Sequence, residues 1–398
     1  MKSITKPKKT SKQRQPEPRI IDLYDLLIYL RKVKDKRKRR GIRYSIEVIL
    51  VLFIIAKLCG QNKVYGIADW VQQRSEYLAE ALHLSRKRMP HHSTYRRILT
   101  EEIEGEELEQ IIGKYLSQLP RSGQDIVVVI DGKTVRGTIT KKDIFGLHLL
   151  TAYLPGEGIV LMQMVVEKDK ENEIVVAPKL LNCLDLRNKI VIGDAMQTQR
   201  QLSTQIIEAG GQFVWIVKDN QAKTKEAIQR LFAPEKPKPG TGCPPMDFIS
   251  TKTVQKQAGR LEVRTLTVSD MLNDYIEWPH TGQVFMLERR FTNLSTGEIT
   301  SEVVYGLTSL TRQSTGPVQL MNILRSEWGI ENGLHYRRDV TYQEDQTRMT
   351  QKAMGRVMAI INNLVISLLN NHGYKNHAHA RRVFDAHPFK AFVLSRGL

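Results

Sequence analysis

The sequence predicts an α/β protein, in which an all-α N-terminal domain precedes an α/β core that carries a β-rich insertion. Two changes of pattern along the chain lead to this prediction. Between residues 45 and 119, apolar side chains recur at helical spacing, as in Ile46–Leu58. From residue 126 the pattern changes to short β-branched runs, which are typical of strands buried on both faces of a sheet. The length of 398 residues gives room for about two to four domains.

The α/β core is predicted to follow the order β-β-β-α-β-α-β. The strands are expected over residues 126–130, 146–154, 159–167, 189–193 and 213–218, and the two helices over 174–184 and 199–209. This is the order of the RNase H-like fold. A proline-rich stretch at 233–246 then precedes β patterning that continues to about residue 308, and helical periodicity returns over 317–338 and 352–369.

These patterns divide the chain into five predicted parts. They are a basic, partly disordered arm (1–44), a helical domain with a potential role in DNA binding (45–120), the first part of an RNase H-like core (121–232), a β-rich insertion (233–312) and a helical C-terminal part that completes the core (313–398). The start of the arm is rich in Lys, Pro and Gln, a composition typical of disorder. No internal repeat is visible in the sequence.

The chain is strongly basic, and most of the excess charge lies near its N-terminus. Lys and Arg number 60 against 42 Asp and Glu, a net charge of +18, and the first 44 residues hold 16 basic and 4 acidic side chains, or +12. Such a run gains most from ordering on phosphates, so we expect Arg37, Arg39 and Arg40 to contact DNA. The alternative is a solvated run of charged side chains without a binding role.

Arg96 and Arg97 lie on a short basic helix, which indicates either a helix-turn-helix DNA reader or a helical cap without DNA contact.

Composition and spacing exclude several classes of protein. The three cysteines, Cys59, Cys183 and Cys243, are far apart and form no CxxC pair, which excludes a disulfide framework and a thiolate zinc site. The first 20 residues lack the apolar segment of a secretory signal, and the most apolar stretch, 46–58, is too short to span a bilayer. We therefore expect a cytoplasmic protein without a membrane segment.

Three carboxylates stand at positions that indicate a metal site. Asp131 directly follows strand 126–130 and Asp194 directly follows strand 189–193, so neighbouring strands would bring both to one edge of the sheet. Helical spacing places Glu331 on a mostly apolar stripe that would face this sheet. Together they could hold two Mg²⁺ ions, or Mn²⁺, for in-line phosphoryl transfer. Considered alone, each aspartate is consistent with an ordinary residue at the start of a loop, and Glu331 with an exposed acid on a helix. The RNase H-like fold, however, places acids at these three positions.

Five short segments of the chain resemble motifs of one known family. They are DGKTVRG at 131–137, ENEI at 171–174, GDAMQ at 193–197, VKDNQ at 217–221 and WGIENGLH at 328–335. In this order they resemble the H-repeat-associated insertion-sequence transposases, a DDE family within the RNase H-like superfamily. The resemblance extends over about residues 20–375 and includes the helical N-terminal region.

The resemblance implies cleavage at transposon ends and joining of the freed 3′-hydroxyl to target DNA. Asp131, Asp194 and Glu331 take the family's catalytic and metal-binding positions. The implied partners are the inverted repeats at the transposon ends, target DNA and, because two ends must be paired, a second copy of the chain. The implied location is the bacterial cytoplasm, with the nucleoid. Four basic side chains are the predicted phosphate contacts, with ordinary loop cations as the alternative: Lys133, Arg136, Lys218 and Arg338.

One departure from related transposases lies around Glu331. Relatives often show Tyr-x2-Arg-x3-Glu-x6-Lys here, whereas this chain has Leu324, Glu327, Glu331 and Arg338 at those positions. Glu327 is therefore a rival metal ligand one turn away, and His335 either orients Glu331, touches DNA or packs in the core.

Two other functions stay open: a transposase-derived DNA-binding protein without catalysis, and another metal-dependent nuclease with an RNase H-like fold.

Overall fold

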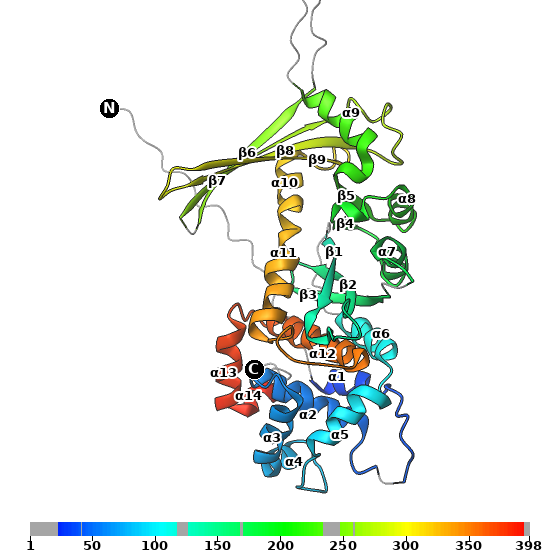
Figure 1. Cartoon of the computed structure of the whole chain (residues 1–398), viewed down its shortest axis with the longest axis vertical. Helices are drawn as coiled ribbons and strands as arrows, with labels where there is room; N and C mark the ends of the chain where they lie inside the picture. The colour runs from blue at the N-terminus through cyan, green and yellow to red at the C-terminus, as the bar shows by residue number, and fades with distance from the viewer. Residues whose placement is uncertain are drawn as a thin grey trace, which may run out of the picture.

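The computed structural model describes residues 23–40, 42–117, 126–167, 170–233, 247–257 and 259–393. The first 22 residues of the predicted basic arm and the proline-rich stretch 234–246 lie outside the described residues. The molecule is elongated. The N-terminal helices form one end, the central sheet forms the middle, and a β extension forms the other end (Figure 1).

Five strands form the RNase H-like core that the sequence predicts. They are β1 (Ile126–Val135), β2 (Leu147–Leu154), β3 (Ile159–Val166), β4 (Lys189–Gly193) and β5 (Gln212–Val217). β1 pairs antiparallel with β2 and β2 antiparallel with β3, whereas β1 pairs parallel with β4 and β4 parallel with β5. This order confirms the predicted fold class. β1 is longer than predicted because its second half continues past the end of β4 and pairs with β2 alone.

The β-rich insertion extends the core sheet and does not form a sheet of its own. Its four strands are β6 (Ile249–Gln257), β7 (Arg260–Ser269), β8 (Gln283–Asn293) and β9 (Ile299–Thr308). β9 pairs antiparallel with β5, so the sheet has nine strands in the order β3-β2-β1-β4-β5-β9-β8-β7-β6. This pairing brings side chains of β8 and β9 to the end of β5, at the edge of the sheet where the parallel strands end.

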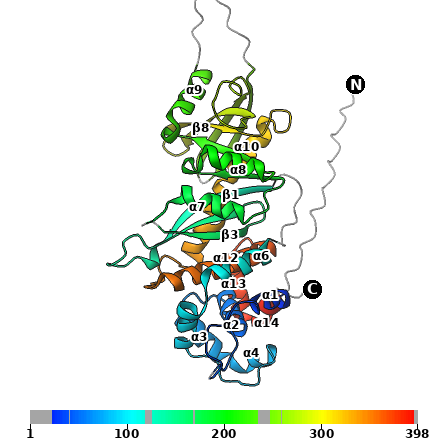
Figure 2. The ribbon, with the colours of Figure 1, turned by 90° about the vertical axis from the view of Figure 1, so that its right-hand side faces the viewer.

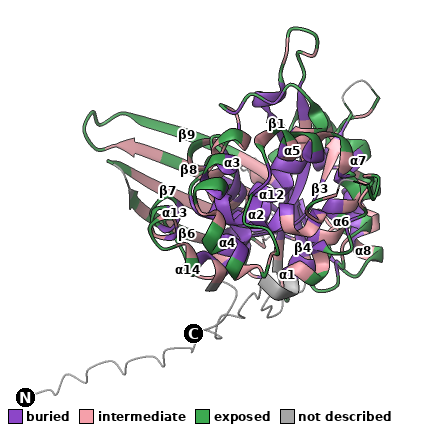
Figure 3. Cartoon of the chain, turned by 90° about the horizontal axis from the view of Figure 1, so that it is seen from below, coloured by how far each residue is buried: buried purple, intermediate pink, exposed green. Residues whose placement is uncertain are grey.

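Helices cover both faces of the core sheet (Figure 2). On one face lie α7 (Glu173–Asn182) and α8 (Arg200–Glu208), and α9 (Ala222–Phe232) continues this layer over β8 and β9. On the other face, α6 (Gly105–Leu116) and α12 (Lys352–Asn371) contact β3. Among the described residues, α12 is the one helix long and apolar enough to cross a membrane, and 78% of its apolar window is buried inside the protein. Its position at the centre of the fold is that of a core helix (Figure 3).

The N-terminal and C-terminal helices pack on this core helix directly or through one another. The N-terminal ones are α1 (Leu23–Leu30), α2 (Ile46–Leu58), α3 (Val64–Gln73), α4 (Ser75–Ala81) and α5 (His92–Arg97). α2 is buried over nearly its whole surface, because α12, α13 (His377–Ala386) and α14 (Pro388–Val393) all contact it. The N-terminal and C-terminal helices therefore share one apolar core with the sheet.

A buried polar network joins α2 to α12 through the chain that follows Glu331. The Lys57 ammonium donates to Asn362 Oδ1 (2.7 Å), and Asn362 Nδ2 donates to Glu344 Oε1 (2.8 Å). Glu344 also forms an ion pair with Arg338 (2.6 Å), and neither of these two side chains is exposed. Burial lowers the pKa of Lys57 to about 7. The N-terminal helices thus help to fix the position of the segment beyond Glu331.

Candidate active site

The structure brings Asp131 and Asp194 to the same edge of the sheet. The residues that precede them, Ile130 and Gly193, are paired in register on the parallel strands β1 and β4. Paired strands are about 4.8 Å apart, so the two aspartates begin from neighbouring points. The Asp194 carboxylate also accepts the N–H of Met196 (3.3 Å), which fixes the turn after β4.

Glu331 reaches this edge from a helical arm on the other side of the cleft. The arm begins with α10 (Pro317–Ser326) and α11 (Trp328–Ile330) and continues as two wide, π-helical turns, Glu331–His335 and Arg337–Thr341. The helical segment expected over 317–338 is present, but its hydrogen-bond pattern is irregular: it breaks at Glu327, whose backbone stays α-helical, and widens from Glu331 onward. Wide turns of this kind recur at functional sites, because they redirect the side chains that follow.

Two glycines allow the arm to lie against the sheet. A Cβ atom at Gly329 would lie 2.4 Å from Pro155, and one at Gly333 would lie 2.5 Å from the Tyr153 hydroxyl. Both approaches are closer than a side chain permits. Glu331 lies between the two glycines, so this close contact sets how far its carboxylate extends toward the edge of the sheet.

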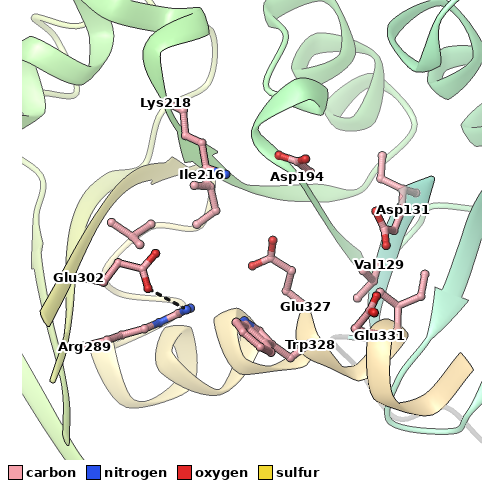
Figure 4. Close-up of a pocket in the computed structure, with 13 residues that line it drawn as sticks. Val129, Asp131, Asp194, Ile216, Lys218, Arg289, Glu302, Glu327, Trp328 and Glu331 are labelled. Carbon is pink, nitrogen blue, oxygen red and sulfur yellow. Dashed lines mark ion pairs between the residues drawn. The ribbon is translucent and has the colours of Figure 1, made fainter. Parts of the chain in front are cut away.

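The three predicted carboxylates line one cleft of about 350 Å³ (Figure 4). Asp131 and Asp194 project into it from the sheet, and Glu331 and Glu327 project from the helical arm. Oxygen atoms of Asp131 and Glu331 and a ring nitrogen of His335 lie within 4.8 Å of one another. Asp194 is outside this closest group but faces the same space.

Negative charge accumulates in the cleft. Burial raises the pKa of Asp131 to about 7, and the nearby carboxylates of Glu173, Glu331 and Asp194 act in the same direction. Burial also raises the pKa of Glu327 to about 7, with a smaller contribution from Asp194. Carboxylate oxygens are the ligands that Mg²⁺ and Mn²⁺ prefer. Because a divalent cation among them would relieve this repulsion, the donor set fits such a metal.

His335 contacts the two closest carboxylates. Its Nδ1 atom is 3.3 Å from Glu331 Oε2 and 3.4 Å from Asp131 Oδ2, and 6% of its side chain is exposed. Burial, together with the charges of Arg338 and Lys133, lowers its pKa to about 3. The ring is therefore neutral near pH 7, and its contact with Glu331 is a hydrogen bond, not an ion pair. Its four-residue spacing from Glu331 is the sequence signal for this contact.

The basic residues predicted beside the metals occupy different environments. Lys218, at the end of β5, lines the cleft. Arg136 is 78% exposed; its Nε atom lies 3.9 Å from the Asp345 carboxylate, which also accepts the Arg136 backbone N–H (2.9 Å). Lys133 is 9% exposed and its ammonium pairs with Asp339 (2.7 Å). Lys218 and Arg136 are therefore available to phosphates, whereas Lys133 is committed to an internal ion pair, which corrects the prediction for that residue.

Two other predicted DNA contacts are also inaccessible. Arg338 has no exposed side-chain surface and pairs with Glu344, because the wide turns of the arm redirect it into the core. The Arg37 side chain is 8% exposed and pairs with Asp35. In this structure neither arginine can reach DNA, and we do not propose them as contacts. The other predicted arginines are exposed: Arg39, Arg40, Arg96 and Arg97.

A basic groove lies between the N-terminal helices and the segment that leads into α12. Its volume is about 470 Å³. The exposed side chains of Lys63, Tyr65, Arg96 and Arg348 line it, together with the half-buried ring of His92. Met349 at this groove donates its N–H to the Gly137 carbonyl (2.8 Å), so the groove adjoins the end of β1. Sequence patterns did not indicate Lys63 or Arg348, because the fold alone brings these distant segments together.

The insertion contributes a further side chain to the cleft. Arg289 on β8 pairs with Glu302 on β9 (3.7 Å), and its guanidinium lies 5.5 Å from the centre of the Trp328 ring (Figure 4). Trp328 is 56% exposed. No local pattern predicts this group, since it depends on the pairing of β9 with β5.

Comparisons with known proteins find relatives over most of the chain. Residues 122–368 match the family model described as "Transposase DDE domain", and residues 27–116 match one described as "DDE_Tnp_1-associated". The Escherichia coli "H repeat-associated putative transposase YhhI" is 25% identical over 360 residues, which cover 88% of this chain and 92% of that protein. The Escherichia coli protein YbfL is 26% identical with the same coverage. A solved structure of a piggyBac transposase synaptic complex with hairpin DNA also matches. The match covers 94% of this chain and 78% of the transposase chain, at 11% sequence identity and a TM-score of 0.45.

Proposed function

This chain belongs to the DDE transposase family, and on that premise we propose that it cleaves the ends of a transposon and joins the freed 3′-hydroxyl to target DNA. Family membership implies the use of a divalent metal. We propose two Mg²⁺ ions, with Mn²⁺ as an alternative. The observation that carries the proposal is the convergence of Asp131, Asp194 and Glu331, from three separate parts of the chain, on one cleft.

Five polar side chains at or beside the cleft have distinct roles in this proposal. Asp131 and Asp194 from the sheet, and Glu331 from the arm, would hold the metal between them. Metal ions held there would supply activation of the attacking oxygen and stabilisation of the leaving oxygen in an in-line displacement. His335 orients Glu331 toward Asp131, and Lys218 neutralises a non-bridging phosphate oxygen. The reaction needs no nucleophilic side chain from the protein.

We place the DNA next to the cleavage site along β1, from the cleft to the basic groove. Arg136 lies five residues beyond Asp131, about 17 Å along the strand. The groove follows directly, through the contact of Met349 with Gly137. This path corresponds to about five base pairs of duplex, at roughly 3.4 Å for each pair. Since two ends must be paired, we propose that a homodimer acts on chromosomal DNA in the cytoplasm.

A strand-transfer assay tests the proposed function. Purified protein is incubated with Mg²⁺, a plasmid that carries the chromosomal DNA flanking the gene on both sides, and a supercoiled target plasmid. We expect cleavage in both flanks and covalent joining of the freed ends to the target, read by sequencing the junctions. Hydrolysis without joining would favour another RNase H-like nuclease, and binding without cleavage would favour a non-catalytic derivative; either result contradicts the proposal.

The basic groove makes a separate prediction about salt dependence. Replacing Lys63, Arg96 and Arg348 together with alanine should weaken binding to a duplex of mixed sequence. It should also reduce the slope of log affinity against log salt by about 1 for each phosphate contact that is lost. Fluorescence anisotropy of a labelled duplex over a series of salt concentrations measures both quantities.

An equal loss of charge elsewhere provides the control. Arg187, Lys223 and Arg230 are exposed and lie near the helices on the opposite face of the sheet. Their triple alanine variant has the same net charge as the groove variant and should keep the wild-type slope. Equal slopes for the two triple variants would show that net charge, and not the groove, sets the affinity.

A further inference from the structure

The Glu173 carboxylate lies between the stretch of β1 that carries Asp131 and the turn that follows Asp194. Glu173 is the first residue of α7, and 16% of its side chain is exposed. Its Oε1 atom contacts His148 Nε2 (2.8 Å), and its Oε2 atom accepts a hydrogen bond from the Gln197 amide (3.0 Å). A carboxylate can only accept hydrogen bonds, so His148 donates here as well.

On one side, this carboxylate is connected to Asp194. Gln197 ends the short turn Ala195–Gln197 that begins directly after Asp194, and its side chain is buried. The hydrogen bond from Gln197 to Glu173 therefore holds that turn against the start of α7. Asp194 itself accepts the N–H of Met196 within the same turn, so a shift of the turn would move its carboxylate.

On the other side, the carboxylate is connected to Asp131. A Cβ atom at Gly132 would lie 2.1 Å from Glu173 Oε1, so the carboxylate packs directly on that backbone. The Gly132 N–H donates to Asp131 Oδ1 (2.9 Å). His148 adds a second link, because its Nδ1 atom contacts the Thr134 hydroxyl (2.8 Å) on the same strand.

Helix capping does not account for Glu173. The N-terminus of α7 is already capped by Asn172, whose side chain accepts the Val175 N–H (3.2 Å). The Glu173 carboxylate turns instead toward β2 and the turn after β4, where both of its oxygens have partners.

We propose that Glu173 is a positioning residue for the transposition reaction, which fixes the separation of Asp131 and Asp194 through Gln197, Gly132 and His148. This inference rests on the proposed function. Groups that hydrogen-bond directly to metal ligands typically change metal affinity or activity by about 10- to 100-fold when they are removed. Glu173 is one contact further from the aspartates, so we expect an effect at the lower end of this range. Glu173 would act in this way, without touching DNA or the reacting atoms.

Reversing one hydrogen bond tests the proposal. Glu173→Ala removes both contacts, and Gln197→Glu places two carboxylates face to face. Adding Glu173→Gln to Gln197→Glu restores the bond with donor and acceptor exchanged, while the new amide oxygen still accepts from His148. We expect each of the first two variants to lose about tenfold in Mn²⁺ affinity and in cleavage rate, and the double variant to recover most of both. Electron paramagnetic resonance of free Mn²⁺ measures the affinity without DNA.

Two more variants separate positioning from general stability. Glu171→Ala is the matched control, because Glu171 precedes the same helix but pairs with Lys179, away from the aspartates. It should bind Mn²⁺ and cleave like the wild type. Gly132→Ala should repeat the loss seen for Glu173→Ala, since the added methyl group displaces the Glu173 carboxylate.

Two results would overturn the inference: a Glu173→Ala variant that behaves like Glu171→Ala, or a double variant no better than Gln197→Glu alone. Failure of the proposed function looks different. It would appear in the wild-type protein, as an absence of Mn²⁺ binding and of cleavage before any substitution is made.

Discussion

Replacing Asp131 with asparagine is expected to lower the rate of DNA strand cleavage by about a thousandfold or more. The substitution keeps the size of the side chain but removes a charged ligand from the metal site. A metal ion contributes several kcal/mol to the transition state of phosphoryl transfer. Since about 1.4 kcal/mol corresponds to a tenfold change in rate, the loss of metal support produces an effect of this size. The initial rate of cleavage of the flank-bearing plasmid in Mg²⁺ measures it.

Asp219 provides a control of equal charge in a neighbouring turn. It follows β5, as Asp194 follows β4, but its carboxylate is 92% exposed and pairs with Lys225 (2.8 Å). Asp219→Asn should therefore leave the cleavage rate close to that of the wild type. A loss comparable to that of Asp131→Asn would mean that cleavage responds to charge near the sheet edge in general, and Asp131 would lose its assigned role.

The same assay decides between Glu331 and its rival Glu327. Both line the cleft, but Glu331 is the one grouped with Asp131 and His335. We therefore expect Glu331→Gln to match the loss of Asp131→Asn and Glu327→Gln to lose less. The reverse order would assign the third ligand to Glu327 and would leave the hydrogen bond from His335 to Glu331 without a catalytic purpose.

Much of the core could be predicted because its signals are local. A run of β-branched residues such as Val127–Ile130 indicates a buried strand. An acid at the end of such a run is costly to bury unless a positive group compensates it, so two of them on neighbouring strands indicate a metal site. The order of such runs was enough to predict the RNase H-like core and to place Asp131 and Asp194 at one sheet edge. Helical spacing indicated that Glu331 faces the sheet, and the RNase H-like fold and the family resemblance singled it out as the third carboxylate.

The features that could not be predicted depend on contacts between distant segments. The pairing of β9 with β5 joins Thr308 to Val214, and no short-range pattern encodes it. The two wide turns of the arm are also not visible in the spacing of its apolar residues along the sequence. Each wide turn takes up an extra residue, which rotates the following side chains by about 100° relative to a regular helix. Arg338 therefore points into the core, although regular spacing places it on the same face as Glu331.

The burial of Arg338 leads to a large expected effect on stability. Glu344→Gln removes the charge that compensates the Arg338 guanidinium while keeping the shape of the side chain. Both partners are fully buried, so an uncompensated cation is left in the interior. Removing one partner of such a pair typically destabilises a protein by about 3–5 kcal/mol. The free energy of unfolding from urea titration should fall by about this amount.

An exposed ion pair supplies the comparison for this measurement. Asp185 pairs with Arg187, and their side chains are 56% and 76% exposed. Asp185→Asn should change the free energy of unfolding very little, because water screens an exposed pair. If Glu344→Gln had an equally small effect, Arg338 would not be buried in solution, and its predicted contact with DNA would become tenable again.

The double variant Arg338→Met with Glu344→Leu decides whether Arg338 serves the stability of the protein or contacts DNA. Replacing a buried ion pair by apolar side chains of similar volume is often neutral or stabilising, so most of the lost stability should return. Asn362 loses one acceptor in this variant, a deficit of about 1 kcal/mol. Because Arg338 does not reach DNA in this structure, the double variant should also cleave the plasmid at close to the wild-type rate. A stable double variant with greatly reduced cleavage would instead place Arg338 among the groups that contact DNA, in a conformation in which the chain beyond Glu331 has left the core.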